Sequence, residues 1–219
     1  MNKQTGFTLI ELAIVLVIIG LLLGGVLRGQ ELINSARVKN LTRDFQNVQV
    51  YLYGYQDRFR AIPGDDGRAA ERLPGPPVAI NALGANANNG LINGQWNSAN
   101  VADESFLFWQ HVRLAGLAPG STDTGNAAAF IPRNANNGRI GIQSIGAGFT
   151  KINDMQGSYA ICSDLILGRD ALQIDTTLDD GNTATGNIRV RPTGVDGASS
   201  PTVDVTAAQA AQYTVCMSL

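Results

Sequence analysis

The sequence predicts an α+β fold: one long N-terminal helix followed by a globular head with a small antiparallel sheet. Three observations lead to this prediction: an apolar run near the N-terminus, an apolar stripe at helical spacing after it, and short strand-like segments towards the C-terminus. A chain of 219 residues suffices for one hydrophobic core of ordinary size. We therefore expect a single head joined to an extended helix.

The N-terminal segment begins with six mostly polar residues and continues into an apolar run, residues 7–27, in which Glu11 is the only charged residue. That run has about the 20 residues that a helix needs to cross a bilayer. A secretory signal peptide has its small cleavage residue after the apolar stretch, whereas here Gly6 stands before it. Lys3 and the initiator amine precede the run, so the positive-inside rule predicts a cytoplasmic N-terminus and an exported head.

The hexapeptide GFTLIE at residues 6–11, followed by the apolar run, resembles the class III signal of type IV pilins and type II secretion pseudopilins. This resemblance covers roughly residues 1–60. It implies that a prepilin peptidase cuts after Gly6 and N-methylates Phe7, and that the mature chain assembles into a filament. It also implies the ladle-shaped pilin fold, in which the amphipathic half of the helix packs against the sheet of the head.

Glu11 is the residue of the apolar run that requires an explanation. A carboxylate inside an apolar helix costs several kcal/mol unless it is paired or protonated. In one interpretation, Glu11 lies near the headgroups and its side chain reaches water. The resemblance implies another, which we favour: Glu11 of one subunit neutralises the free amine of Phe7 on a neighbouring subunit.

The resemblance also implies domain boundaries, partners and location. Residues 1–6 form a leader that is removed, residues 7–28 the membrane-spanning and filament-core helix, residues 29–62 its amphipathic continuation, and residues 63–219 the head. The expected partners are prepilin peptidase, other copies of the chain or related pilins, the inner-membrane assembly platform and the membrane itself. We expect a single-pass precursor in the bacterial inner membrane and, after processing, a pilus or periplasmic filament.

The amphipathic continuation is predicted from apolar residues with spacings of 3, 4, 3, 4, 3 and 4, at Val38, Leu41, Phe45, Val48, Leu52, Tyr55 and Phe59. Amphipathic helices usually bury such a stripe within their own chain, so we expect it to dock on the sheet. Pro63-Gly64 predicts a turn that ends the helix. We expect Asp65 and Asp66 to serve that turn or cap the next segment, rather than bind a metal.

The head is predicted to alternate loops with short elements. Residues 74–100 are rich in Pro, Asn and Gly, which predicts a loop unable to fill a core. Helical spacing predicts a helix over residues 103–117. The pattern of apolar residues predicts strands at 138–145, 159–162, 188–191 and 213–217 and a helix at 171–178.

The two cysteines, Cys162 and Cys216, suit either one disulfide in an oxidising compartment or two buried thiols in a reducing one. Because the N-terminal segment predicts export of the head, we predict that they form a disulfide.

Composition argues against several functions. The 16 basic and 18 acidic residues form no basic run, so nucleic acid is not expected as the main partner. The sole histidine, His111, has no nucleophile or acid beside it and is predicted to be an interface or surface residue. Two cysteines 54 residues apart make no zinc motif. We expect neither catalysis nor a required cofactor.

Calcium remains an option at Asp179 and Asp180, in a turn that loosely resembles the calcium loops of some pseudopilins. Aligning Gly181 with the glycine of an EF-hand loop places Thr176 and Leu178 where acidic ligands are needed, so that template fails. An Asp-Gly turn without metal is the simpler interpretation.

Two functions other than a pilus subunit are consistent with the sequence. One is a type II secretion pseudopilin. The other is a membrane-anchored periplasmic binding module, whose Asn- and Gly-rich loop at residues 81–100 would recognise a ligand. Such a module would keep Met1, whereas a filament subunit would begin with methyl-phenylalanine.

Overall fold

The computed structural model describes residues 9–146, 155–194 and 210–219. Its first element, helix α1 (Leu9–Phe59), is 51 residues long. No proline interrupts the sequence before Pro63, and Glu11 in the first turn and Arg58 in the last both interact favourably with the helix dipole. The chain divides within this helix into an N-terminal unit, Met1–Lys39, and a C-terminal unit, Asn40–Leu219.

In the N-terminal unit, residues 9–28 of α1 are mostly apolar and exposed on every side. All residues from 9 to 28 are exposed, including fourteen large apolar ones between Leu9 and Leu27. An 18-residue window of the helix reaches a mean hydropathy of 2.8, so α1 is long and apolar enough to cross a membrane by length and composition. An apolar surface on all faces needs lipid or other helices to cover it.

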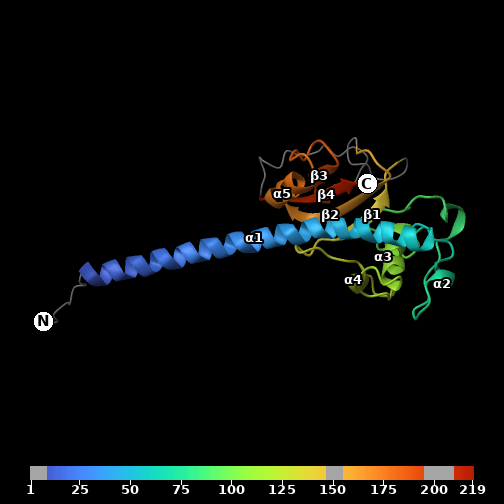
Figure 1. The fold of residues 1–219 in the computed structure, drawn as a ribbon, viewed down its shortest axis with the longest axis horizontal. Coiled ribbons are helices and arrows are strands. Elements are labelled where there is room, and N and C mark those ends of the chain that lie inside the picture. The colour runs from blue at the N-terminus through green and yellow to red at the C-terminus, as the bar shows by residue number, and fades with distance from the viewer. Residues whose placement is uncertain (1–8, 147–154, 195–209) are drawn as a thin grey trace. The chain divides into compact units, whose positions relative to one another are not determined.

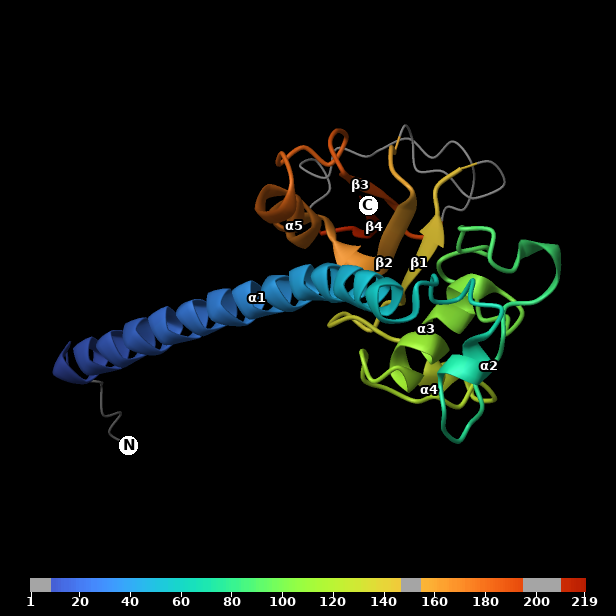
Figure 2. The same ribbon diagram turned by 45° about the vertical axis from the view of Figure 1, so that its right-hand side comes forward.

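In the C-terminal unit, the same helix becomes amphipathic, and the predicted stripe is buried from Leu41 to Tyr55, whereas Phe59 at its end is half-buried. Leu41, Phe45, Val48, Leu52 and Tyr55 are each exposed by 2% or less. The intervening positions are exposed or half-buried except for Thr42, which gives this part of α1 one core face and one solvent-facing side. Figure 2 shows this part of the helix running across the sheet.

The sheet has four antiparallel strands in the order β1-β2-β4-β3, with β1 at Ile140–Ser144, β2 at Tyr159–Leu167, β3 at Ile188–Pro192 and β4 at Gln212–Ser218. Helix α5 (Gly168–Leu178) leads from β2 towards β3 (Figure 1). The predicted α+β class, with a long helix packed on a small antiparallel sheet, is confirmed.

Strand β2 is longer than the segment 159–162 that the sequence predicts. Its pairing with β4 shifts register between Ser163 and Ile166, and Leu165 adopts a φ of 55°. Such a bulge breaks the alternation of buried and exposed side chains, which is why the sequence pattern ends early.

Helix α3 (Glu104–Leu114) lies within the predicted range 103–117 and is buried from Glu104 to Arg113. Three shorter helical turns complete the head: α2 (Ala69–Arg72), η1 (Gly84–Asn86) and α4 (Ala127–Phe130).

The prediction that residues 74–100 cannot fill a core was wrong. Ile92 is fully buried and Trp96 is exposed by only 5%. The loop lies along the edge of β1, where the Ile92 N–H donates to the Ser144 hydroxyl and the Trp96 N–H donates to the Gln143 side chain. Because β1 satisfies these backbone groups, two apolar residues of a polar loop can enter the core.

Candidate functional site

The predicted processing and assembly signal lies at the start of α1. Gly6 and Phe7 fall outside the described residues, so cleavage after Gly6 and methylation of Phe7 remain sequence predictions. Glu11 lies in the first turn of the helix with an exposed side chain. Its proposed partner belongs to another subunit, so the assembly ion pair also remains a prediction.

Three glycines lie in the exposed apolar part of α1. A Cβ built on Gly20, Gly24 or Gly25 would meet nothing within 4 Å. Small residues at such a spacing let a second helix approach closely in lipid. This part of α1 can therefore pack tightly against other helices.

The two cysteines occupy facing positions on the central strands of the sheet. Cys162 on β2 pairs in register with Cys216 on β4, and their sulfur atoms form a disulfide. Both residues are buried in a small cluster with Trp96 and Met155. The structure thus agrees with the predicted disulfide, rather than with two separate thiols.

Asp66 connects the end of α1 to the segment that follows it. Its carboxylate accepts hydrogen bonds from the Tyr55 hydroxyl at 2.9 Å, the Arg68 N–H at 2.9 Å and the Arg72 guanidinium at 2.7 Å. Burial raises the pKa of Asp66, but the bonds from Arg72, Arg68 and Tyr55 outweigh it and hold the pKa below its usual value. Asp66 is therefore a charged, structural anchor.

Asp65 binds the backbone of a different loop, at residues 89–90. Its carboxylate accepts the N–H groups of Asn89 at 3.1 Å and Gly90 at 2.8 Å. Neither this residue nor Asp66 caps α2, whose N-cap is Arg68. Of the two predicted roles, turn or cap, Asp66 has the turn role, because its carboxylate accepts the Arg68 N–H two residues later, whereas Asp65 holds the loop at residues 89–90.

The prediction that His111 is an interface or surface residue was also wrong. Its side chain is fully buried, and its ring stacks on Tyr55 with the ring centroids 6.1 Å apart. Nδ1 accepts the Gly64 N–H at 2.9 Å, which leaves Nε2 to donate to the Ile80 carbonyl oxygen at 2.7 Å. These contacts assign a neutral tautomer, and burial lowers the pKa of His111.

A pocket of about 210 Å³ lies beside the amphipathic part of α1 and is also lined by Trp109 of α3, Ile140 of β1 and loop residues at 118–119 and 132–133. Its walls combine aromatic, apolar and charged side chains, among them Tyr51, Trp109, Asp44 and Arg133. Burial raises the pKa of Asp44 to about 6.

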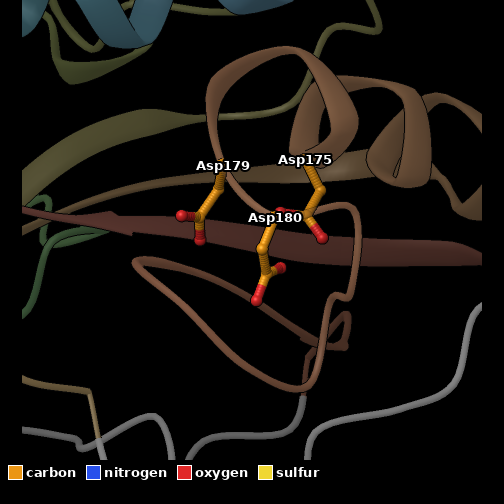
Figure 3. A group of neighbouring side chains, drawn as sticks. All are labelled: Asp175, Asp179 and Asp180. Atoms are coloured by element: carbon orange, nitrogen blue, oxygen red, sulfur yellow. The ribbon is translucent and has the colours of Figure 1, made fainter.

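Asp179 and Asp180, the calcium candidates, lie beside a third aspartate that the sequence reasoning missed. One carboxylate oxygen of each and of Asp175 lie within 4.8 Å of one another (Figure 3). Asp175 precedes Asp179 by four residues, one helical turn, and that spacing was the signal that could have identified it.

Comparison with known proteins identifies the N-terminal segment. Residues 1–27 match the family model for the prokaryotic N-terminal methylation motif, which is the class III prepilin signal. The match includes the GFTLIE hexapeptide and the apolar run, so the resemblance noted in the sequence is confirmed there. No curated protein matches the chain.

Proposed function

We propose, from the class III prepilin signal at residues 1–27, that this chain is the precursor of a subunit of a type IV pilus or pilus-like filament. The observation that carries the proposal is the continuity of this signal with α1. The matched residues include the apolar part of α1, which is exposed on all sides, and the helix continues from there without a break to Phe59. A subunit that is anchored first in lipid and later in a bundle of like helices needs this arrangement.

In the proposed pathway, the apolar part of α1 holds the precursor in the inner membrane with its N-terminus in the cytoplasm. Prepilin peptidase removes residues 1–6 and methylates Phe7. The assembly platform then transfers the helix from lipid into the filament, where neighbouring helices cover its apolar surface. In the filament, the large apolar side chains leave lipid and pack closely against neighbouring helices. The van der Waals contacts of this packing then hold the filament together.

Glu11 contributes to this step through its charge. The new Phe7 amine is positive, so it is unfavourable inside an apolar bundle without a counter-charge. Glu11 follows Phe7 by four residues, and the carboxylate of one subunit would neutralise the amine of the next.

The disulfide supports export of the head, because disulfides persist in oxidising compartments. It fits a pilus and a type II secretion pseudopilus equally, and the prepilin signal is common to both. Deleting the gene separates the two: loss of surface filaments indicates a pilus, whereas loss of secreted proteins with filaments intact indicates a pseudopilus.

The proposal is tested by the N-terminus of the protein purified from membranes. We expect mass spectrometry to find methyl-phenylalanine from Phe7 as the first residue. Gly6→Val should remain at precursor mass because a branched side chain does not fit a peptidase site that accepts glycine. Thr5→Val, one residue earlier, is the matched control and should be processed.

Two results would contradict this proposal. An intact Met1 on the wild-type protein would favour the membrane-anchored binding module. Normal processing of Gly6→Val would show that the cut site lies elsewhere.

A further inference from the structure

The pocket beside the amphipathic part of α1 contains the half-buried carboxylate of Asp44. Its volume of about 210 Å³ is enough for a small molecule. We propose that this pocket binds a small organic molecule with one primary ammonium group and a compact apolar body. Filament assembly through α1 assigns no role to the pocket, so this inference goes beyond the proposed function and does not depend on it.

Asp44 is the residue that points to a cation. Burial raises its pKa to about 6, with no hydrogen bond or positive charge opposing the shift. None of the three ion pairs among the described residues involves it. A carboxylate that is partly removed from water without a partner is costly, and a bound cation would remove that cost.

Two further oxygen acceptors line the pocket on the same face of α1. Asn47 and Tyr51 follow Asp44 at spacings of three and then four residues, so the three side chains lie side by side. Burial, and then the charge of Asp44, raises the pKa of Tyr51, which places its hydroxyl near the carboxylate. A primary ammonium has three N–H donors, so a carboxylate, a hydroxyl and a side-chain carbonyl oxygen together can satisfy it.

The other walls of the pocket are mostly apolar and come from α1, α3, β1 and two loops. A bare inorganic cation would leave this surface in contact with water, whereas an alkyl or aryl group would cover it. The pocket therefore favours an amine with an apolar body. The apolar lining residues are Val48, Trp109, Ala118, Pro119, Pro132 and Ile140.

Two arginines lie near the pocket without neutralising Asp44. Arg133 lines the pocket, but it is exposed and donates to the Asn137 carbonyl oxygen at 2.8 Å. Its charge lowers the pKa of Asp164, not that of Asp44. Arg113 donates to three backbone carbonyl oxygens and does not lower the pKa of Asp44 either. A ligand group beside Asp44 therefore meets a negative charge.

The proposal is tested on the full chain in detergent with phenethylamine, a primary amine on a phenyl ring. At pH 8, Asp44 is ionised and an alkyl amine is protonated. Because Trp109 lines the pocket, we expect a saturable change in tryptophan fluorescence, with half-saturation at about 1 mM for a ligand of this size.

Two analogues test the charge of the ligand. 2-Phenylethanol has a similar shape without the charge, and 3-phenylpropionate carries the opposite charge, so both should bind more weakly by about tenfold or more. Equal binding of either analogue would overturn the role of the ammonium group. No saturation by phenethylamine at concentrations about twentyfold above the expected value would overturn the site.

Matched variants locate the bound amine. Asp44→Asn keeps the size of the side chain and removes an unpartnered charge, so it should fold and weaken phenethylamine binding by about 10–100-fold. Tyr51→Phe removes one neutral acceptor and should weaken binding by about 2–10-fold. Asp57→Asn is the control, because Asp57 lies exposed on the same helix and outside the pocket. Unchanged binding in Asp44→Asn, or an equal loss in Asp57→Asn, would overturn the proposal.

Discussion

The hydroxyl of Tyr55 on α1 donates a buried hydrogen bond to the carboxylate of Asp66, 2.9 Å away. The bond ties the last turns of the long helix to the segment that leaves it. Tyr55→Phe keeps the buried ring but removes a hydrogen bond to a charged group, so we expect the free energy of unfolding to fall by about 1.5–3 kcal/mol. Denaturation followed by tryptophan fluorescence measures this change, since Trp96 and Trp109 both lie in the head.

The control for that substitution is Tyr53→Phe on the same helix. The Tyr53 side chain is 48% exposed, so removing its hydroxyl should cost little. The free energy of unfolding should change by no more than about 0.5 kcal/mol. Equal effects of the two substitutions would show that the Tyr55–Asp66 bond does not stabilise the head.

Acid should destabilise the head through His111. Its folded pKa lies below the usual value of 6.5, so the unfolded chain takes up a proton at a higher pH than the folded chain does. The stability that neutral His111 provides is therefore complete above pH 6.5 and is lost as the pH falls below it. Protonation of Nδ1 would also break the hydrogen bond from the Gly64 N–H.

The measurement compares the Tm of wild type and His111→Gln between pH 8 and pH 5. Asp44 acts in the opposite direction, because its raised pKa of about 6 favours folding as the pH falls, but it is present in both proteins. We expect the advantage of wild type to shrink towards pH 5. Since His111 is the only histidine, a constant difference would rule out this source of acid sensitivity.

Removing the disulfide should weaken the head substantially. The bridge joins residues 54 apart, and in the chain-entropy model a loop of this length contributes about 4 kcal/mol. The double variant Cys162→Ala/Cys216→Ala should lose about that much stability and become insensitive to reductant, whereas the Tm of wild type should fall in reductant. Recovery of both cysteines as free thiols in non-reducing peptide maps of exported protein would contradict the disulfide.

Glu11→Ala should separate processing from assembly. The substitution removes an intramembrane charge and leaves Gly6 and Phe7 intact, so insertion and cleavage should continue. Incorporation into filaments should fall sharply, because an unpaired buried amine costs about 3–5 kcal/mol. The ratio of mature protein in sheared filaments to that in membranes, in cells without a wild-type copy, measures the effect.

Glu31→Ala is the control for this variant. Glu31 lies on the exposed surface of the same helix, beyond the residues that match the methylation motif. It should enter filaments normally. If Glu11→Ala does so too, then Glu11 is better explained as a residue at the membrane surface.

Periodic patterns made most of the fold predictable from the sequence. The stripe from Leu41 to Tyr55 and the position of helix α3, though not its burial, follow from spacing alone. Strand order does not, because it depends on contacts between β2, β3 and β4 that no local pattern records. The burial of Ile92 was missed for a related reason: the polar composition of its loop gave no sign that the edge of β1 would satisfy the backbone.

The candidate site residues divide in the same way. Gly6, Phe7 and Glu11 lie within one hexapeptide, so the sequence alone proposes them, and their roles stay predictions. Asp179 and Asp180 were recognised as a pair, but Asp175 belongs to a helix, and only the end of α5 brings it beside them. The prediction for His111 was wrong because α3 is buried on all sides. No local sequence pattern shows that the Gly64 N–H and the Ile80 carbonyl oxygen lie beside its ring.

The strand order β1-β2-β4-β3 has a consequence for how the head is made. Strand β4 is the last of the four to be synthesised, yet it lies between β2 and β3 and carries one half of the disulfide. During translation, β2 and β3 therefore lack their shared neighbour until β4 has also been made. Closure of the sheet and oxidation of the cysteines thus both wait for β4, so a head truncated before Gln212 would leave β2 and β3 without their shared neighbour and open to proteases.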